Sequence, residues 1–316
     1  MSGNSIGRRL VLTSFGESHG KCIGAVLDGC PAGLELEEKD IQKMLDLRKP
    51  GQSLVSTQRK EGDIVEILTG TFRGYTTGAP ITMVIWNKDQ KSIAYEKLRT
   101  EMRPGHSDYP AYMKYKKFND HRGGGRFSGR LTATHVMGGA IARKLLKDIS
   151  DIGLPTGTEF LDLISPQYIS DLISWGAIGA RTAESQVHRE LTSGLSCPMG
   201  IKNSTNGDLQ VAVDAMKSAK YQHVFLGTTK QGKVAIFKTS GNDDTHIILR
   251  GGEKPNYDVS DIEQCISTLA EEKTNMNLMV DFSHGNSQKN HENQKIVCKS
   301  IAEPVSYTHL TLPTKA

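Results

Sequence analysis

The chain has 316 residues, of which 37% are hydrophobic, 23% charged and 6% aromatic. This length allows one large domain or two medium ones, and the recurring apolar segments exclude a disordered chain. The sequence lacks the run of about 18 apolar residues that a membrane span needs, and its first residues do not read as a secretory signal. Five cysteines without a C-x-x-C pair predict a reduced, cytoplasmic setting.

The net charge of +4 is unevenly distributed. Residues 1–148 contain 24 Lys and Arg against 16 Asp and Glu, a charge of +8, whereas residues 149–316 have a charge of −4. This step predicts two units with different ligands. The basic half suits either nucleic acid or small polyanions, and its motifs must decide between them.

The first half combines short strands with two helices. Apolar runs predict strands at residues 64–68 and 81–86. A helix is predicted over residues 37–47, with an apolar face and a stop at Pro50 and Gly51, and a second over residues 132–147 with a basic last turn.

The second half has the alternation of consecutive βα units. Helix-like stretches separate its short apolar strands, which are predicted at residues 160–162, 177–180, 199–201, 223–226 and 278–281. Each strand ends in polar or charged residues, as in parallel barrels. The boundary between the halves is expected within residues 141–154.

Three glycine-rich clusters in the first half carry residues suited to chemistry. They read GESHG at residues 16–20, RPGHSD at residues 103–108 and RGGGRFSGR at residues 122–130. Glycine frees backbone N–H groups to form an anion nest, and arginine forks suit phosphates and carboxylates. An RNA-binding RGG loop is the alternative interpretation. A helix follows the third cluster directly, which favours small anions over nucleic acid.

In this order the clusters resemble chorismate synthase. Further matching runs lie at residues 3–7, 28–33, 48–51 and 57–59, and the resemblance covers residues 3 to about 146. The resemblance implies conversion of 5-enolpyruvylshikimate 3-phosphate to chorismate by anti elimination of phosphate. It also implies reduced FMN that is not net consumed, NADPH as the flavin's reductant, and a homotetramer.

The same resemblance assigns residue roles. His19 and His106 would form the acid–base pair, and Arg48 would bind substrate or a reducing nucleotide. FMN would contact three consecutive residues, Arg126, Phe127 and Ser128. A substrate with two carboxylates and a phosphate needs several cations, and imidazoles titrate near the working pH, so the residue types agree.

The second half resembles class I 3-deoxy-7-phosphoheptulonate (DAHP) synthase, from about residue 141 to residue 303. The matching runs lie at residues 157–162, 174–182, 184–190, 193–198, 246–252 and 281–287. The family is a (β/α)8 barrel that joins phosphoenolpyruvate to erythrose 4-phosphate with a divalent metal.

The resemblance to this second family also assigns five residues. Arg181, Lys202 and Arg250 would hold phosphoenolpyruvate, with Glu159 beside that site, and His284 would be a metal ligand. Taken alone, Lys202 and Arg250 would equally be solvated charges at strand ends. The family's cysteine, glutamate and aspartate metal ligands have no counterpart in the sequence, so the predicted metal site is incomplete.

The sequence therefore predicts an α/β chain of three parts: a chorismate-synthase-like α+β part at residues 1–146, a partial (β/α)8 TIM barrel at 147–304, and a tail at 305–316. The tail fits neither family and resembles translated cloning or sequencing adapter. Small phosphorylated anions are the expected partners, without nucleic acid or membrane. Three readings remain: chorismate synthase, DAHP synthase, or an inactive chimera of the two that joins within residues 141–146 and retains anion binding by residues 122–130.

Overall fold

The computed structural model describes residues 3–48, 62–88, 92–230 and 232–307. The chain divides into two compact units, Met1–Asp148 and Ile149–Ala316. The predicted helix stop at Pro50, the matching run at residues 57–59 and most of the predicted tail lie outside the described residues.

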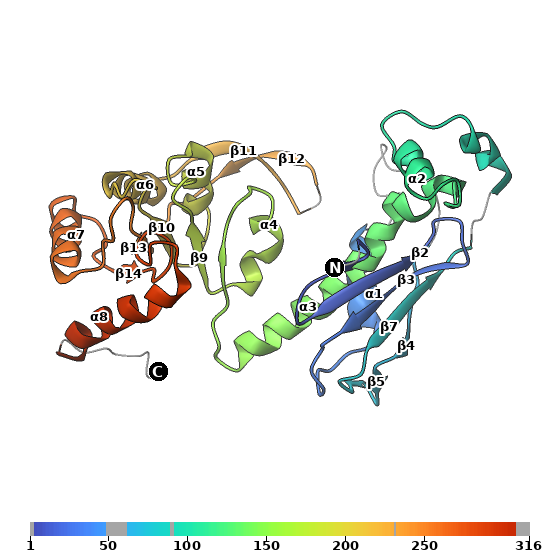
Figure 1. Cartoon of the computed structure of the whole chain (residues 1–316), viewed down its shortest axis with the longest axis horizontal. Helices are drawn as coiled ribbons and strands as arrows, with labels where there is room; N and C mark the ends of the chain where they lie inside the picture. Colours follow the sequence, from blue (N-terminus) through green and yellow to red (C-terminus); the bar gives the residue numbers. More distant parts are fainter. Residues whose placement is uncertain (1–2, 49–61, 89–91, 231, 308–316) are drawn as a thin grey trace. The chain divides into compact units, whose positions relative to one another are not determined.

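A five-stranded antiparallel sheet forms the first unit, in the order β1-β2-β3-β7-β4 (Figure 1). Its strands are β1 (Ser5–Ile6), β2 (Val11–Gly16), β3 (Cys22–Asp28), β4 (Val65–Thr69) and β7 (Ile81–Trp86). Two short strands, β5 (Thr71–Phe72) and β6 (Tyr75–Thr76), pair as a separate hairpin. The strands predicted at residues 64–68 and 81–86 are thus confirmed, the first with a shift of one residue.

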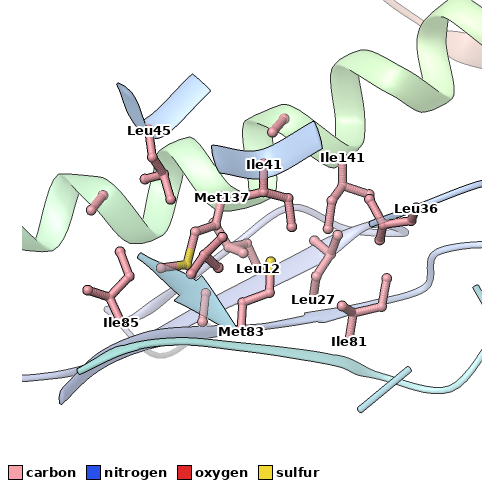
Figure 2. Close-up of a cluster of buried hydrophobic side chains, with 14 of the residues drawn as sticks. Leu12, Leu27, Leu36, Ile41, Leu45, Ile81, Met83, Ile85, Met137 and Ile141 are labelled. Atoms are coloured by element: carbon pink, nitrogen blue, oxygen red, sulfur yellow. The ribbon is translucent and has the colours of Figure 1, made fainter. Parts of the chain in front are cut away.

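Two helices, α1 (Glu38–Arg48) and α3 (Thr132–Asp151), cover one face of this sheet (Figure 2). Alternate residues of β3 and β7 point to that face because strand side chains have a period of two. The helices meet them with apolar residues spaced three or four apart. The labelled side chains of this core are Leu12, Leu27, Leu36, Ile41, Leu45, Ile81, Met83, Ile85, Met137 and Ile141.

The predicted helices both exist, but the second differs at its end. α3 continues to Asp151, beyond the predicted end at Lys147, and its last turn contains no basic residue. The prediction of a basic C-terminal turn was therefore wrong. The boundary between the units, after Asp148, falls inside this helix.

A parallel sheet forms the second unit, in the order β14-β13-β10-β9-β8. Its strands are β8 (Gly157–Glu159), β9 (Trp175–Ile178), β10 (Met199–Lys202), β13 (Thr245–Leu249) and β14 (Leu278–Val280). The accompanying helices are α4 (Pro166–Ile169), α5 (Gln186–Ser193), α6 (Gln210–Lys220), α7 (Val259–Glu271) and α8 (Gln294–Tyr307), with the 3₁₀ turns η4 (Ser170–Leu172) and η5 (His291–Asn293). In the described part of the chain β8 and β14 are edge strands and the sheet does not close into a barrel.

One strand prediction in this unit was wrong, and a second strand exists but lies outside the parallel sheet. The run at 160–162 follows β8 rather than forming it. Phe160, the first residue after that strand, is buried in the hydrophobic core. The run at 223–226 lies in β11 (Val224–Thr228), which pairs with β12 (Val234–Lys238) as a two-stranded antiparallel hairpin outside the parallel sheet. A short apolar run does not show whether the strand pairs with its neighbour in a hairpin or enters a parallel sheet. No helix in the described residues is both long and apolar enough to cross a membrane.

Candidate functional site

His19 lies in the turn of the hairpin that joins β2 to β3. Its side chain is buried, at 5% exposure, and its ring centroid is 4.6 Å from that of Tyr95. A Cβ atom added to Gly123 would stand only 2.3 Å from Cδ2 of His19. Gly123 also has a φ of +58°, so glycine there permits both the backbone conformation and the close approach of the imidazole.

His106 lies against Gly124, the next residue of the arginine-rich loop at residues 122–130. A Cβ atom on Gly124 would be 2.4 Å from Cε1 of His106. His106 precedes the helix α2 (Asp108–Lys114), and its Nδ1 is 2.7 Å from Oδ1 of Asp108. The fold therefore sets the two predicted acid–base histidines against adjacent glycines of the arginine-rich loop, although their sequence positions are far apart.

Asp108 orients His106. Arg103 binds the Asp108 carboxylate through two nitrogens, Nε at 2.8 Å and Nη2 at 2.9 Å. These hydrogen bonds hold the pKa of Asp108 at about 2, against an ordinary 3.8, despite the opposing effect of burial. The carboxylate stays ionised near neutral pH and can accept a hydrogen bond from Nδ1–H of His106. In the other tautomer, Nδ1 accepts from Arg103 Nη2 at 3.2 Å. Either contact holds the Nδ1 side of the ring and leaves Nε2 on the opposite side.

We expect this ion pair to make stability depend on pH in the acid range. A carboxyl whose pKa is depressed on folding stabilises the protein above its unfolded pKa, and that contribution is lost as the pH falls from about 4 towards 2. Urea unfolding of the wild type and of Asp108→Asn should give midpoints that differ at pH 6 and converge near pH 2. An equal difference at both pH values would show that charge is not the cause.

The arginine-rich loop comprises two 3₁₀ turns, η2 (Arg122–Phe127) and η3 (Gly129–Leu131). Gly123, Gly124 and Gly125 all have positive φ, a backbone conformation that is unfavourable for residues with a Cβ atom. The guanidinium of Arg126 donates to two neutral side chains, Asn4 Oδ1 at 3.2 Å and Ser14 Oγ at 2.5 Å, so these bonds leave its positive charge uncompensated.

The predicted FMN contacts lie on this loop. Phe127 is 40% exposed, with its ring 6.2 Å from that of Tyr115, and Ser128 Oγ accepts from the backbone N–H of Arg130. A positive charge with neutral partners and an exposed aromatic ring are groups that fit a phosphate-bearing, planar cofactor. Contact of Arg126, Phe127 and Ser128 with FMN stays a prediction.

A buried ion cluster lies next to this loop. Asp63, with a fully buried side chain, accepts from Arg130 Nη1 at 2.6 Å and from Arg48 Nη1 at 3.0 Å. Arg48 also donates to Thr132 Oγ1 and to the carbonyl of Gly129. In this structure Arg48 therefore joins the end of α1 to η3, and its predicted contact with substrate or nucleotide stays a prediction.

A cavity of about 230 Å³ adjoins the arginine-rich loop at Gly124, and a further 3₁₀ turn, η1 (Ser92–Arg99), supplies part of its lining. Gly124, Asp108 and His121 line it, together with the cations Arg99 and Lys117. Its volume lies below the range of about 300–1,000 Å³ that is usual for ligand pockets, so it suits only a small molecule.

The second unit gathers charges at the carboxyl ends of its parallel strands. Lys202, at the end of β10, places Nζ 2.7 Å from Oε2 of Glu159 and 3.8 Å from Oδ2 of Asp281. His284 Nδ1 is 2.8 Å from the same Asp281 oxygen. Burial raises the pKa of Asp281, but hydrogen bonds from Ser283 and the nearby His284 outweigh it and lower that pKa overall.

The two predicted arginines lie outside this group of contacts. Arg181 is exposed on the turn after β9, and the guanidinium of Arg250 donates to the carbonyl of Gly251 at 3.3 Å. The backbone N–H of Arg250 donates to Oδ1 of the buried Asn203, which fixes the chain after β13. Their predicted contact with phosphoenolpyruvate stays untested.

The residues present do not fit a divalent metal at His284. The described residues contain no group of three or more His, Cys, Asp or Glu side chains able to hold one. The ammonium of Lys202 also lies beside Asp281, the carboxylate nearest to His284, and it would repel a cation there.

Sequence reasoning left out several contacts that complete these sites. It placed Asp108 in one cluster with His106 but gave it no role. Asp63 could not, because its contact with Arg130 joins positions 67 residues apart. Asp281 lies in a quoted run, but its link to Lys202 requires the parallel sheet.

Histidines and arginines gathered on a glycine loop are typical of enzymes that act on small phosphorylated molecules. The family model described as chorismate synthase matches residues 10–222, and the chain belongs to the chorismate synthase family. This match extends past Asp148 into the second unit.

The chain is also similar to the Trp-sensitive phospho-2-dehydro-3-deoxyheptonate aldolase of Escherichia coli K12, an enzyme also called DAHP synthase. The identity is 53% over 165 residues, which are 52% of this chain and 47% of that protein. The Haemophilus influenzae aldolase is 54% identical over 168 residues, 53% of this chain and 46% of the relative.

The structure of this aldolase from Francisella tularensis SCHU S4 matches with a TM-score of 0.52 and 53% identity, covering 57% of this chain and 52% of that one. The chain thus spans about half the length of the curated relatives it matches. Both families predicted from the sequence are present.

Proposed function

We propose that the first unit binds 5-enolpyruvylshikimate 3-phosphate and eliminates its phosphate to give chorismate. The arrangement of His19 and His106 against adjacent glycines of the arginine-rich loop carries this proposal. Both imidazoles can exchange protons beside a surface that attracts carboxylates and phosphate. Reduced FMN, when bound, would supply reducing equivalents that are returned at the end of the cycle.

The protein residues would divide the work. Arg126 offers positive charge to the anionic groups, and the Arg48–Asp63–Arg130 cluster, with two cations to one carboxylate, adds a further positive charge. Asp108 holds His106 in one orientation for proton transfer at Nε2. NADPH as the reductant, a homotetramer and a cytoplasmic location are the parts of the proposal that rest on family analogy alone.

The test is turnover under anaerobic conditions with dithionite-reduced FMN. We expect chorismate and phosphate to appear in equal amounts, and His19→Ala or His106→Ala to lower kcat by about 10²- to 10⁴-fold. His135→Ala, on the exposed side of α3, is the matched control and should leave kcat unchanged. Binding of substrate and FMN without chorismate would favour the inactive chimera, and a failure to bind either would refute the proposal.

A second candidate function belongs to the second unit. We propose that its five parallel strands are part of a (β/α)8 barrel and that Lys202 and Glu159 belong to a phosphoenolpyruvate site. The identity of 53% to DAHP synthases supports this assignment. Because the residues present do not fit a metal, incubation with phosphoenolpyruvate, erythrose 4-phosphate and Mn²⁺ should give no condensation product; product formation would overturn that expectation.

We also propose that the two parts, residues 1–146 and 147–304, were joined within residues 141–146, which lie in α3. The similarity of the chain to two enzymes of one pathway supports a join, and the unit boundary falls inside α3. Long-read sequencing of the source DNA across the codons for residues 135–160 tests it. One uninterrupted locus would show a natural fusion rather than an assembly artefact.

A further inference from the structure

Asn87 connects the loop of His19 to the buried ion cluster. It directly follows β7 and is buried, at 8% exposure. Its Nδ2 donates to the carbonyl of Glu17 at 3.0 Å and to that of Gly20 at 2.8 Å. These two carbonyls stand on either side of His19 in the hairpin turn, so one side chain holds both ends of the segment that carries the imidazole.

The other end of the same amide holds an arginine. Asn87 Oδ1 accepts from Nε of Arg130 at 2.8 Å, and Arg130 is in turn bound to Asp63. An arginine Nε can only donate, so the oxygen of the amide must face Arg130 and its nitrogen must face the two carbonyls. All three contacts of Asn87 are therefore made with the correct polarity, and no other orientation of the amide satisfies them.

Because the amide of Asn87 is neutral, it does not reduce the positive charge of the neighbouring ion cluster. Arg48 and Arg130 share the single carboxylate of Asp63, so the three side chains together have a net positive charge. An aspartate at position 87 would neutralise that charge and would also face the carbonyls of Glu17 and Gly20 with a second acceptor. Asparagine links the two parts without cancelling the attraction for an anion.

We propose that Asn87 is a positioning residue that fixes the His19 turn against Arg130, so that the imidazole and the guanidinium keep one arrangement towards an anionic substrate. The inference rests on the proposed function for its substrate, but the hydrogen bonds by which Asn87 holds the turn do not depend on turnover. The tight approach of His19 to Gly123 leaves little tolerance for movement of this turn.

Hydrogen exchange of the turn tests the link without any ligand. The amides of Ser18 and Gly20 donate to Gly125 O and Glu17 O, and both bonds depend on the shape of the turn. In Asn87→Ala these two amides should exchange at least tenfold faster, while those of β3 stay unchanged. Unchanged exchange in the turn, or an equal rise throughout the hairpin, would overturn the proposal.

Asn242 provides the matched control. It is also buried, its Nδ2 donates to the carbonyls of Thr192 and Cys197, and its Oδ1 accepts from the N–H of Asp244. Asn242→Ala removes the same kinds of bond in the second unit and should leave exchange at Ser18 and Gly20 unchanged. Faster amide exchange at Ser18 and Gly20 in this variant as well would show a general loss of stability and would overturn the specific role of Asn87.

Calorimetric titration with 5-enolpyruvylshikimate 3-phosphate separates position from charge. We expect about a tenfold weaker affinity in Asn87→Ala and a larger loss in Asn87→Asp, which adds a negative charge beside Arg130. An affinity equal to wild type in Asn87→Asp would overturn the charge argument. If the wild type itself binds no substrate, the proposed function fails, whereas the exchange experiment still decides whether Asn87 fixes the turn.

Discussion

Asp63→Asn is expected to destabilise the first unit by about 3–5 kcal/mol, because it leaves two guanidinium groups in a buried site without their carboxylate. The side chain of Asp63 is fully buried and that of Arg130 is 6% exposed, so water cannot replace the partner that Arg130 loses, whereas Arg48 is 21% exposed and can be partly hydrated. Asparagine tolerates the φ of +46° at this position as well as aspartate does, so the substitution tests charge rather than backbone strain.

Urea unfolding followed by the fluorescence of Trp86 measures this loss, since Trp86 is the one tryptophan of the first unit and Trp175 is in the second. Asp40→Asn is the matched control. Asp40 also pairs with a cation, Lys144 at 2.9 Å, but both side chains are about a quarter exposed, and we expect a loss of at most about 1 kcal/mol. Equal losses in the two variants would contradict the importance of burial.

Gly123→Ala is expected to lower kcat/KM for phosphate elimination by about 10²-fold, with a smaller effect on folding. The added methyl would stand 2.3 Å from Cδ2 and 2.6 Å from Nε2 of His19, so the imidazole must move. A displacement of about 1 Å in a reacting group can cost this much in rate. The positive φ of Gly123 adds about 1–2 kcal/mol of backbone strain for alanine.

Gly129→Ala, in the same loop, has nothing within 4 Å of its added methyl and should retain full kcat/KM. The variants can be compared by steady-state kinetics and by the NMR signals of the His19 ring. A Gly123→Ala protein with an unshifted His19 ring and wild-type kcat/KM would contradict the close packing of the two residues.

The fold was predictable from sequence where a regular pattern repeats within one element. The helix with Ile41 and Leu45 and the strand with Ile81, Met83 and Ile85 appear where hydrophobic periodicity places them. The run containing Phe225 has the same apolar character, but it pairs with β12 as a hairpin instead of entering the parallel sheet. Periodicity reports burial of a face and does not report which strand supplies the hydrogen bonds.

The sequence alone determined which residue types are available for chemistry. The order of its motifs also indicated the two families, because glycine, histidine and arginine at fixed spacing reflect the backbone conformations that these loops require. Only the tertiary structure decided how those residues combine. It placed His19 and His106 against adjacent glycines, shared Asp63 between Arg48 and Arg130, and made Asn87 the link between them. These contacts join positions tens of residues apart, and they exist because strand pairing and helix packing bring remote segments together.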